Sequence, residues 1–219
     1  MRIVFISDTH TLHDAVEVPE GDVLVHAGDF SSRGLTHEVT AFAEWFRRHG
    51  HPHKIVVAGN HDFLCEREPE KAREILGDVT YLDTEGVVVE GLKVWGSPWQ
   101  PWFHDWAFNL PRGEELAEHW ALAPSGVDML VTHSPPMGCL DRTVRGEHVG
   151  CADLEAALLR IQPRVHVFGH IHEAAGTVVR HDESLAINAS NCDVRYRPVN
   201  PAVCVDWDVD GPRLVESGR

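Results

Sequence analysis

Five short segments of the chain carry side chains that bind metal ions or transfer protons. Their carboxylates, imidazoles and single amide belong to Asp8, His10, Asp29, Asn60, His61, His133, His170 and His172. Oxygen and nitrogen ligands of this kind, with no thiolate among them, suit Mn, Fe or Zn better than Cu(I) or a structural zinc ion. In Asp8-x-His10 and His170-x-His172 the paired residues stand two apart, so extended backbone directs both side chains the same way. We therefore predict that each pair serves one metal cluster.

A short apolar run rich in Val and Ile precedes each of these segments. The runs cover residues 3–6, 23–25, 55–57, 129–131 and 165–168. Their length and composition are typical of strands buried on both faces. Ligands of open α/β sheets gather outside the carboxyl ends of the strands, so we expect the five strand ends to converge. Gly28, Gly59 and Gly169 each stand before a candidate ligand, where glycine permits a sharp turn and a close approach of the backbone.

Helix-like stretches lie between the expected strands. Apolar periodicity and helix-end residues predict helices over 39–48, 69–76 and 154–161, the last with Asp153 as its N-cap. This alternation predicts an α/β architecture with helices outside the sheet. In the last third, strand-like runs over 177–180, 185–188, 202–207 and 213–216 are separated by turns such as Asp210-Gly211-Pro212, which indicates hairpins and a mixed β core. The length suits a single domain over residues 1–219.

Composition narrows the class of protein. Hydrophobic residues make up 43% and charged residues 24%, close to the average for a globular protein. The formal net charge of -15 disfavours binding to long nucleic acids or anionic membranes, although bound cations can reverse the local sign at a phosphate site. No apolar run is long enough to span a membrane. Five scattered cysteines, with no CxxC pair, indicate reduced thiols in a cytoplasmic protein.

The order of the motifs resembles a known family. The patterns DxH, GDx, GNHD, a lone His after a strand, and GHxH follow one another as in the calcineurin-like metallophosphoesterases, and all five are intact here. The segments 96–103, 109–113 and 166–173 resemble more narrowly the metallophosphoesterase-domain-containing branch, related to class III cyclic nucleotide phosphodiesterases. The resemblance runs from the first expected strand to about residue 201. It implies a four-layer αββα metallophosphoesterase sandwich, in which two packed mixed β-sheets are flanked by helices.

The resemblance also implies a role for each candidate residue. The metal ligands would be Asp8, His10 and His172 for one ion, Asn60, His133 and His170 for a second, and Asp29 as the bridge between them. His61 would face the phosphate as a general acid or charge stabiliser, with Asp62 orienting its ring. The implied cofactors are two divalent transition metal ions, with Mn favoured over Fe or Zn.

The function expected from the motifs and the resemblance is that of a metal-dependent phosphoesterase. Its substrates would be small phosphodiesters, with cyclic nucleotides of the 2',3' or 3',5' type leading, hydrolysed by a hydroxide that two metal ions activate. Two alternatives stay open: a phosphomonoesterase or nuclease built on the same centre, and a non-catalytic binding scaffold, although a scaffold would usually have lost ligands. The expected partner is a small phosphodiester or nucleotide, with no membrane and no long nucleic acid, and a homodimer is left open.

A dense aromatic stretch lies over residues 95–108. It contains Trp95, Trp99, Trp102, Phe103, Trp106 and Phe108. One interpretation is a buried insertion packed on the core; the other is a wall on which a nucleobase stacks, with Trp102 or Phe103 as the contact. Arg33, Arg142 and Arg145 are loop cations near the motifs, for which surface charge and phosphate contact are the two alternatives.

Overall fold

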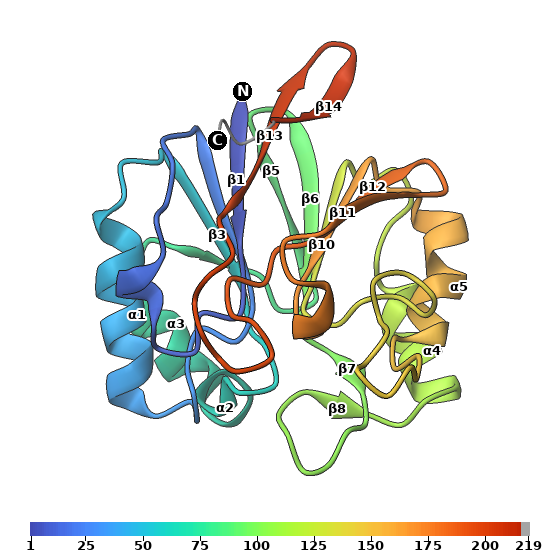
Figure 1. Cartoon of the computed structure of the whole chain (residues 1–219), viewed down its shortest axis with the longest axis horizontal. Coiled ribbons are helices and arrows are strands. Elements are labelled where there is room, and N and C mark those ends of the chain that lie inside the picture. The colour runs from blue at the N-terminus through green and yellow to red at the C-terminus, as the bar shows by residue number, and fades with distance from the viewer. Residues whose placement is uncertain (216–219) are drawn as a thin grey trace.

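Two six-stranded sheets form the centre of the structure, a computed structural model that describes residues 1–215 (Figure 1). The first sheet contains β1 (Arg2–Ile6), β2 (Val23–Ala27), β3 (His53–Val57), β4 (Thr80–Tyr81), β13 (Val203–Asp208) and β14 (Gly211–Leu214), in the order β14-β13-β1-β2-β3-β4. The second contains β5 (Glu85–Val89), β6 (Leu92–Ser97), β9 (Met129–Thr132), β10 (Val165–Phe168), β11 (Val178–His181) and β12 (Ser184–Asn188), in the order β11-β12-β10-β9-β6-β5. A separate two-stranded ribbon pairs β7 (Gln100–Pro101) with β8 (Asn109–Leu110).

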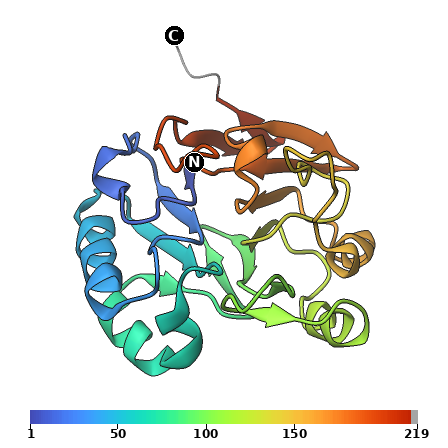
Figure 2. The same cartoon turned by 60° about the horizontal axis from the view of Figure 1, so that its bottom comes forward.

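Helices cover the outer face of each sheet, as the two cartoon views show (Figures 1 and 2). The first sheet carries α1 (Thr36–Arg48), α2 (Phe63–Arg67) and α3 (Pro69–Leu76), and the second carries α4 (Glu114–Ala121) and α5 (Ala152–Ile161). Two 3-10 turns, η1 (His13–Ala15) and η2 (His172–Ala174), lie in loops. Both sheets are mixed: antiparallel strands lie at one edge of the first sheet and at both edges of the second, beside strands that run parallel. The αββα sandwich expected from the sequence is therefore confirmed.

Alternating side chains on the strands build two kinds of core. Ile3 and Phe5 of β1 point inward and join Val165 and Val167 of β10 in the core between the sheets. Val4, their neighbour on β1, points the other way and packs in the core beneath α1 and α3. Strands buried on both faces read as continuous apolar runs, which is why the sequence revealed them.

The three predicted helices are present in the structure, but their predicted first residues are less accurate than their positions in the chain. The helix over 69–76 is confirmed with both its ends. The helix predicted from residue 39 begins at Thr36, because the Glu38 carboxylate accepts hydrogen bonds from the backbone N–H of Leu35 and of Arg33 (3.0 Å each). The prediction that Asp153 caps α5 is wrong: Cys151 Sγ accepts from the Leu154 N–H (3.2 Å).

The last third of the chain forms the hairpins that its turns predicted. β11 pairs with β12 and β13 with β14, both antiparallel. The second turn lies at residues 209–210 rather than at Asp210-Gly211-Pro212, because Gly211 and Pro212 already belong to β14. Proline is tolerated there because β14 is an edge strand. Residue 216, the end of the strand predicted over 213–216, lies outside the described residues.

The sequence reading missed the β5–β6 hairpin and α4. In α4 only Leu116 and Trp120 are buried, four residues apart, and the remaining positions are polar or exposed. A single i, i+4 pair of this kind is a weak periodic signal. Both missed elements belong to the second sheet and its cover, so the sequence under-predicted this half of the sandwich.

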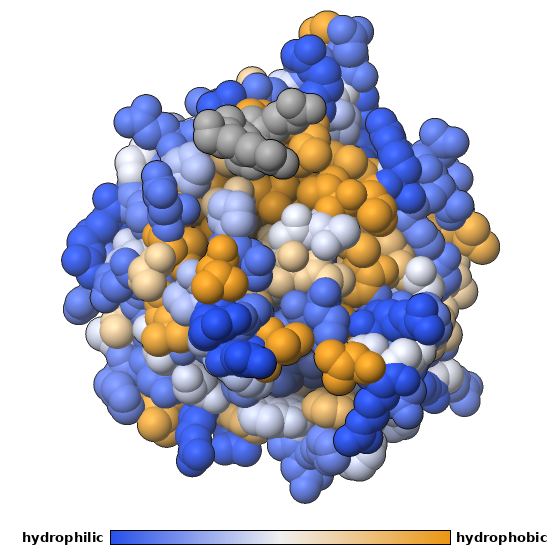
Figure 3. All heavy atoms as spheres, in the orientation of Figure 1, coloured by the Kyte–Doolittle hydropathy of each residue, from blue (hydrophilic) through white to orange (hydrophobic). Residues whose placement is uncertain are grey.

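The outer surface combines a hydrophilic rim with scattered apolar side chains. In the face drawn in Figure 3, hydrophilic residues dominate the periphery and apolar residues gather nearer the centre. Within residues 1–215, none of the helices has the length and apolar character needed to cross a membrane. Among the exposed aromatic side chains, Trp102, Phe103 and Tyr196 belong to loops rather than to the sandwich itself.

The stack of three phenylalanines beneath α1 offers a test of this packing. Phe42 lies between Phe30 and Phe46, with ring centroids 4.3 and 5.1 Å away, and is fully buried. We expect Phe42→Ala to lower the free energy of unfolding by about 3–5 kcal/mol, because it leaves a cavity that the sheet cannot close. Urea denaturation followed by circular dichroism measures this. The control Leu159→Ala, at a position 71% exposed on α5, should change it by less than about 0.5 kcal/mol; similar values for both variants would contradict this account.

Candidate metal centre

The ends of five strands meet at one end of the sandwich. β1, β2 and β3 come from the first sheet, β9 and β10 from the second. The Gly169 N–H donates to the His133 carbonyl (2.9 Å) between β10 and β9, and the His170 N–H donates to Asp8 Oδ1 (3.1 Å) across the two sheets. The strand ends converge as the sequence predicted, but they come from two facing sheets rather than from one.

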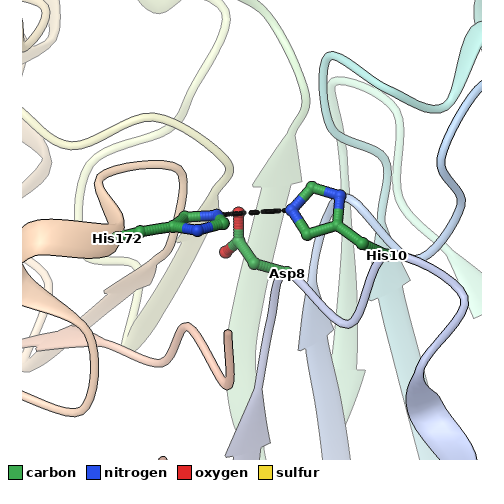
Figure 4. A group of neighbouring side chains, drawn as sticks. All are labelled: Asp8, His10 and His172. Atoms are coloured by element: carbon green, nitrogen blue, oxygen red, sulfur yellow. Dashed lines mark hydrogen bonds and ion pairs between the residues drawn. The ribbon is translucent and has the colours of Figure 1, made fainter. Parts of the chain in front are cut away.

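Asp8, His10 and His172 form the first cluster of the site. Figure 4 shows the two imidazoles directed at the Asp8 carboxylate from either side. Asp8 Oδ1 lies 3.2 Å from His172 Nε2 and 3.8 Å from His10 Nε2, and the two Nε2 atoms are 3.3 Å apart. Asp8 Oδ2 accepts from the Ser190 hydroxyl (2.8 Å), which leaves Oδ1 directed into the cluster.

Asp29, Asn60, His133 and His170 form the second cluster. His133 Nε2 lies 3.0 Å from Asn60 Oδ1 and 3.3 Å from Asp29 Oδ2. The ring of His170 stands 5.1 Å from the ring of His133, and ligand atoms of Asp29, His133 and His170 are mutually within 4.8 Å. The structure therefore brings together all seven residues that the sequence proposed as metal ligands. The prediction that each pair serves one cluster holds for Asp8 and His10 but is wrong for His170 and His172, which divide between the clusters, because the backbone at His170 is left-handed (φ 66°) rather than extended.

Three of the site histidines are oriented by backbone carbonyls. The Nδ1–H groups of His133, His172 and His61 donate to the carbonyl oxygens of Ala27 (2.9 Å), Asp193 (3.0 Å) and Ser32 (2.7 Å). Because Nδ1 then carries the proton of the neutral ring, the lone pair resides on Nε2, which faces the site. This arrangement is typical of imidazoles that bind metal ions.

Asp29 lies between the two clusters. Its Oδ2 is 3.3 Å from His133 Nε2 and 3.9 Å from both His10 Nε2 and His61 Nε2. Its Oδ1 accepts from the His61 backbone N–H (2.8 Å). One carboxylate oxygen thus reaches imidazoles of both clusters, the position that a bridging ligand requires.

The backbone of the site is strained. Asp8, His10, Asp29 and His170 adopt the left-handed region, with φ of 52°, 43°, 56° and 66°. Residues with a side chain enter this region at a cost of about 1–3 kcal/mol each unless the surroundings impose it. Gly169 relieves a different crowding: a Cβ there would overlap the carboxylate of Asp8. The close approach of the backbone to the Asp8 carboxylate accounts for the glycine that stands before His170.

His61 borders the cavity, as the resemblance implied, but Asp62 makes other contacts than those implied. His61 borders the site, and its ring packs at 4.2 Å against the ring of Trp106. Its Nδ1–H is held by the Ser32 carbonyl, so the prediction that Asp62 orients this ring is wrong. The buried Asp62 carboxylate instead accepts from the backbone N–H of Gly59 (2.8 Å), Asp29 (2.9 Å) and Ser31 (3.0 Å). It holds together the loops that carry Asp29 and His61.

Charge in the metal-free chain is balanced by protons. Burial acts to raise the pKa of Asp8 and of Asp29, but the surrounding imidazoles outweigh it and lower both pKa values well below the usual range. Burial acts to lower the pKa of His133 and His172, yet the neighbouring Asp29 and Asp8 raise each pKa to about 9. Two buried carboxylates are therefore compensated by two imidazolium ions.

The donor set fits divalent cations. His10 is buried, its pKa is lowered by burial to about 4, and within residues 1–215 its Nδ1 has no hydrogen-bond partner. In the neutral form, the Nε2 lone pair of His172 faces His10 Nε2 at 3.3 Å, a contact that a cation between the nitrogens would make favourable. Carboxylate, imidazole and amide ligands without thiolate suit Mn, Fe or Zn.

A cavity of about 360 Å³ opens over both clusters. Trp102, Phe103 and Trp106 line it, the first two being 60% and 49% exposed, whereas Trp95 and Phe108 are buried in the core. The ends of the aromatic stretch therefore pack in the core, whereas its middle borders the cavity; the stacking of a base on Trp102 or Phe103 stays a prediction.

The arginines near the site differ from those expected. Arg33 and Arg142 are exposed and are absent from the lining of this cavity, as is Arg145. Arg112 lines it instead, with Nη1 and Nη2 donating to the carbonyls of Gly150 and Val149 (2.8 Å each). Surface charge, the first of the two alternatives, is what the structure shows for the three predicted arginines, and their contact with phosphate stays a prediction. In the sequence, the segment 109–113 that contains Arg112 stands out only through the family resemblance.

The clash at Gly169 predicts a selective loss of metal. We expect Gly169→Ala to displace the Asp8 carboxylate and to reduce bound metal at the first cluster by about half or more of its occupancy. Metal analysis after gel filtration measures this. Gly50→Ala is the matched control, because a Cβ at Gly50 meets no atom within 4 Å. Equal metal content in the two variants would contradict the proposed crowding.

The raised pKa values of His133 and His172 predict a pH dependence of stability. Since each pKa is about 9 in the metal-free folded chain and about 6.5 in the unfolded chain, their stabilising contribution is complete below about pH 6.5 and is lost toward pH 9. Metal competes with these protons. We expect the increase in Tm on adding Mn to be larger at pH 8.5 than at pH 6.5 by calorimetry; an increase that shrinks with pH would contradict this.

Comparisons with known proteins agree with the fold and the site. A family model described as calcineurin-like phosphoesterase matches residues 1–174. Metallophosphoesterase domain-containing protein 1 of Homo sapiens is 43% identical over 230 residues, covering 94% of this chain and 70% of the human protein. Phosphopantetheinyl hydrolase from Mycobacterium tuberculosis shares the fold with a TM-score of 0.63 at 17% identity, covering 99% of this chain and 96% of that one. An archaeal phosphodiesterase does so with a TM-score of 0.54 at 18% identity, covering 98% and 99%. The chain therefore belongs to the calcineurin-like phosphoesterases, a family of metal-dependent hydrolases of phosphoric esters.

Proposed function

We propose that this protein is a binuclear metallophosphodiesterase that hydrolyses small phosphodiesters, with cyclic nucleotides as the leading substrate class. The observation that carries the proposal is the placement of Asp29 between two clusters of buried ligands that open onto one cavity. A single cluster would suffice for a structural metal ion. Two clusters joined by a carboxylate suit the in-line displacement of a phosphoester.

The ligands divide between two ions. Asp8, His10 and His172 would hold the first ion, Asn60, His133 and His170 would hold the second, and Asp29 would contribute to both. When bound, the ions supply positive charge for the phosphate oxygens and lower the pKa of a water molecule toward ~7. We propose Mn as the preferred metal, because the set is rich in oxygen and nitrogen donors and lacks sulfur.

His61 acts on the substrate rather than on a metal ion. Its Nδ1–H is fixed by the Ser32 carbonyl, and its ring borders the cavity beside Trp106. Nε2, the free nitrogen, is then directed to the centre at 3.9 Å from Asp29 Oδ2. Protonated at Nε2, the ring donates a proton or a charge-assisted hydrogen bond to the leaving oxygen.

The cavity favours a small substrate with a planar group. Its volume of about 360 Å³ suits a mononucleotide-sized molecule, and Trp102 and Phe103 present partly exposed rings on which a base can stack. Among residues 1–215, Arg112 is the one arginine that lines the cavity, and the net charge of the chain is -15, both of which weigh against long nucleic acids. Within the described residues all five cysteines are free, which supports a reducing, cytoplasmic setting.

Variants of Asp29 and His61 separate metal binding from turnover. With Mn present, we expect the protein to hydrolyse bis(p-nitrophenyl) phosphate, and Asp29→Ala to lose both bound metal and activity because the shared ligand is removed. His61→Ala should retain metal and lose about 10²- to 10⁴-fold in kcat. Metal analysis and initial rates on the same samples test this, with the exposed His37→Ala as control.

A substrate panel decides between the proposed activity and its rivals. It contains 2',3'-cyclic and 3',5'-cyclic nucleotides, a linear diester and p-nitrophenyl phosphate. We expect the highest kcat/KM for a cyclic diester. A preference for the monoester would favour a phosphomonoesterase, and wild-type activity no higher than that of Asp29→Ala would contradict an enzymatic function.

A further inference from the structure

A tight turn after β12 places an aromatic ring at the cavity that the sequence analysis did not single out. The Asp193 carboxylate closes this turn: Oδ1 accepts from the backbone N–H of Arg195 (2.8 Å) and Arg197 (3.0 Å), and Oδ2 accepts from Arg197 Nε (2.8 Å). The Tyr196 N–H donates to the Asp193 carbonyl (2.8 Å). Hydrogen bonds to both the side chain and the backbone carbonyl of Asp193 therefore hold the turn in place.

The same turn is coupled to the metal centre. The Asp193 carbonyl that accepts from Tyr196 also accepts from His172 Nδ1–H (3.0 Å). Tyr196 itself has a φ of 56°, in the left-handed region that bulky side chains rarely adopt. Strain of this kind persists where surrounding contacts impose it, and it gathers at ligand-binding sites.

The strained backbone directs the Tyr196 ring over the first cluster. Its centroid lies 4.8 Å from that of His10 and 5.2 Å from that of His172, in edge-on arrangements. The residue lines the cavity and remains 51% exposed. A large aromatic side chain held half-exposed against the buried His10 and the partly buried His172 has a free surface that faces the cavity rather than the core.

Aromatic rings thus border both halves of the centre. Phe103 stands 6.3 Å from His170 in the second cluster, and Trp106 packs on His61, whereas Tyr196 lies over the first cluster. Phe103 and Trp106 come from the β7–β8 loop, and Tyr196 comes from a loop about 90 residues later. Two separate segments therefore supply walls to one cavity.

We propose that Tyr196 is a specificity-determining residue that contacts the planar base of a nucleotide substrate and so selects base-bearing phosphoesters over aliphatic ones. The effect of Tyr196 on turnover rests on the proposed phosphodiesterase function. Its effect on nucleotide binding depends only on the cavity and its aromatic walls. Stacking on an aromatic side chain is tolerant of base identity, so Tyr196 selects for the presence of a base rather than for one base.

The test compares Tyr196→Ala and Tyr196→Phe with Arg195→Ala, an exposed position in the same turn outside the cavity lining. Each Mn-loaded variant is assayed for KM and kcat with adenosine 2',3'-cyclic phosphate and with the base-free glycerol 1,2-cyclic phosphate. Calorimetry gives the Kd of 5'-AMP, and metal content and Tm are measured on the same samples.

For Tyr196→Ala we expect the nucleotide KM and the AMP Kd to rise about tenfold, with kcat and metal content retained. KM for the base-free diester should stay within about twofold, since it lacks the group that stacks. Tyr196→Phe keeps the ring and should remain within about threefold of wild type, as should Arg195→Ala.

Other results overturn the proposal. An equal loss for both substrates together with lost metal would show that Tyr196 acts only through His10 and His172. Unchanged KM and Kd, or failure of the wild-type protein to bind AMP, would exclude a base contact. If the wild type binds AMP but hydrolyses neither diester, the proposed phosphodiesterase function fails, and the AMP Kd of the variants alone decides the role of Tyr196.

Discussion

The buried carboxylate of Asp29 is the group on which the rest of the site depends. A charge removed from water must be compensated by nearby charges or hydrogen bonds. Asp29 Oδ1 receives the His61 N–H, and Oδ2 lies among imidazoles of both clusters. Its own N–H is bonded to Asp62, which also holds Gly59 and Ser31. Placing one carboxylate between two clusters thus determines how the loop after β2 meets the loop after β3.

The packed sandwich holds the site residues in a backbone conformation that short isolated segments would not keep. Left-handed backbone at Asp8, His10, Asp29 and His170 is unfavourable in an isolated peptide. Parallel strands buried on both faces end together and hold these residues from two facing sheets. Helices on the outside keep the strand ends free for loops. The close packing of the core stabilises the strands, and this free energy offsets the cost of the strained backbone at the strand ends.

The loops above the centre shape the cavity, and the residues at the strand ends carry the charged and metal-binding groups. Aromatic side chains border the cavity beside each cluster, while Arg112 ties the 149–150 segment to the rim through two carbonyls. Recognition of an organic group can then change with the loops without moving the ligands.

Sequence alone determined the strands that end in candidate ligands, the types of those residues and the α/β class, because each rests on local signals, whereas the sandwich followed from the family resemblance. Apolar runs over 3–6 or 165–168 and motifs such as GHxH lie within a few residues. Tertiary structure decided what depends on residues far apart. It fixed the orientation of His61 through Ser32 rather than Asp62, placed Arg112 rather than Arg33 or Arg142 in the cavity lining, and brought Tyr196 over His10, 186 positions earlier in the chain. Those contacts follow from how two sheets pack and how loops are bonded, and no periodicity within a short segment encodes them.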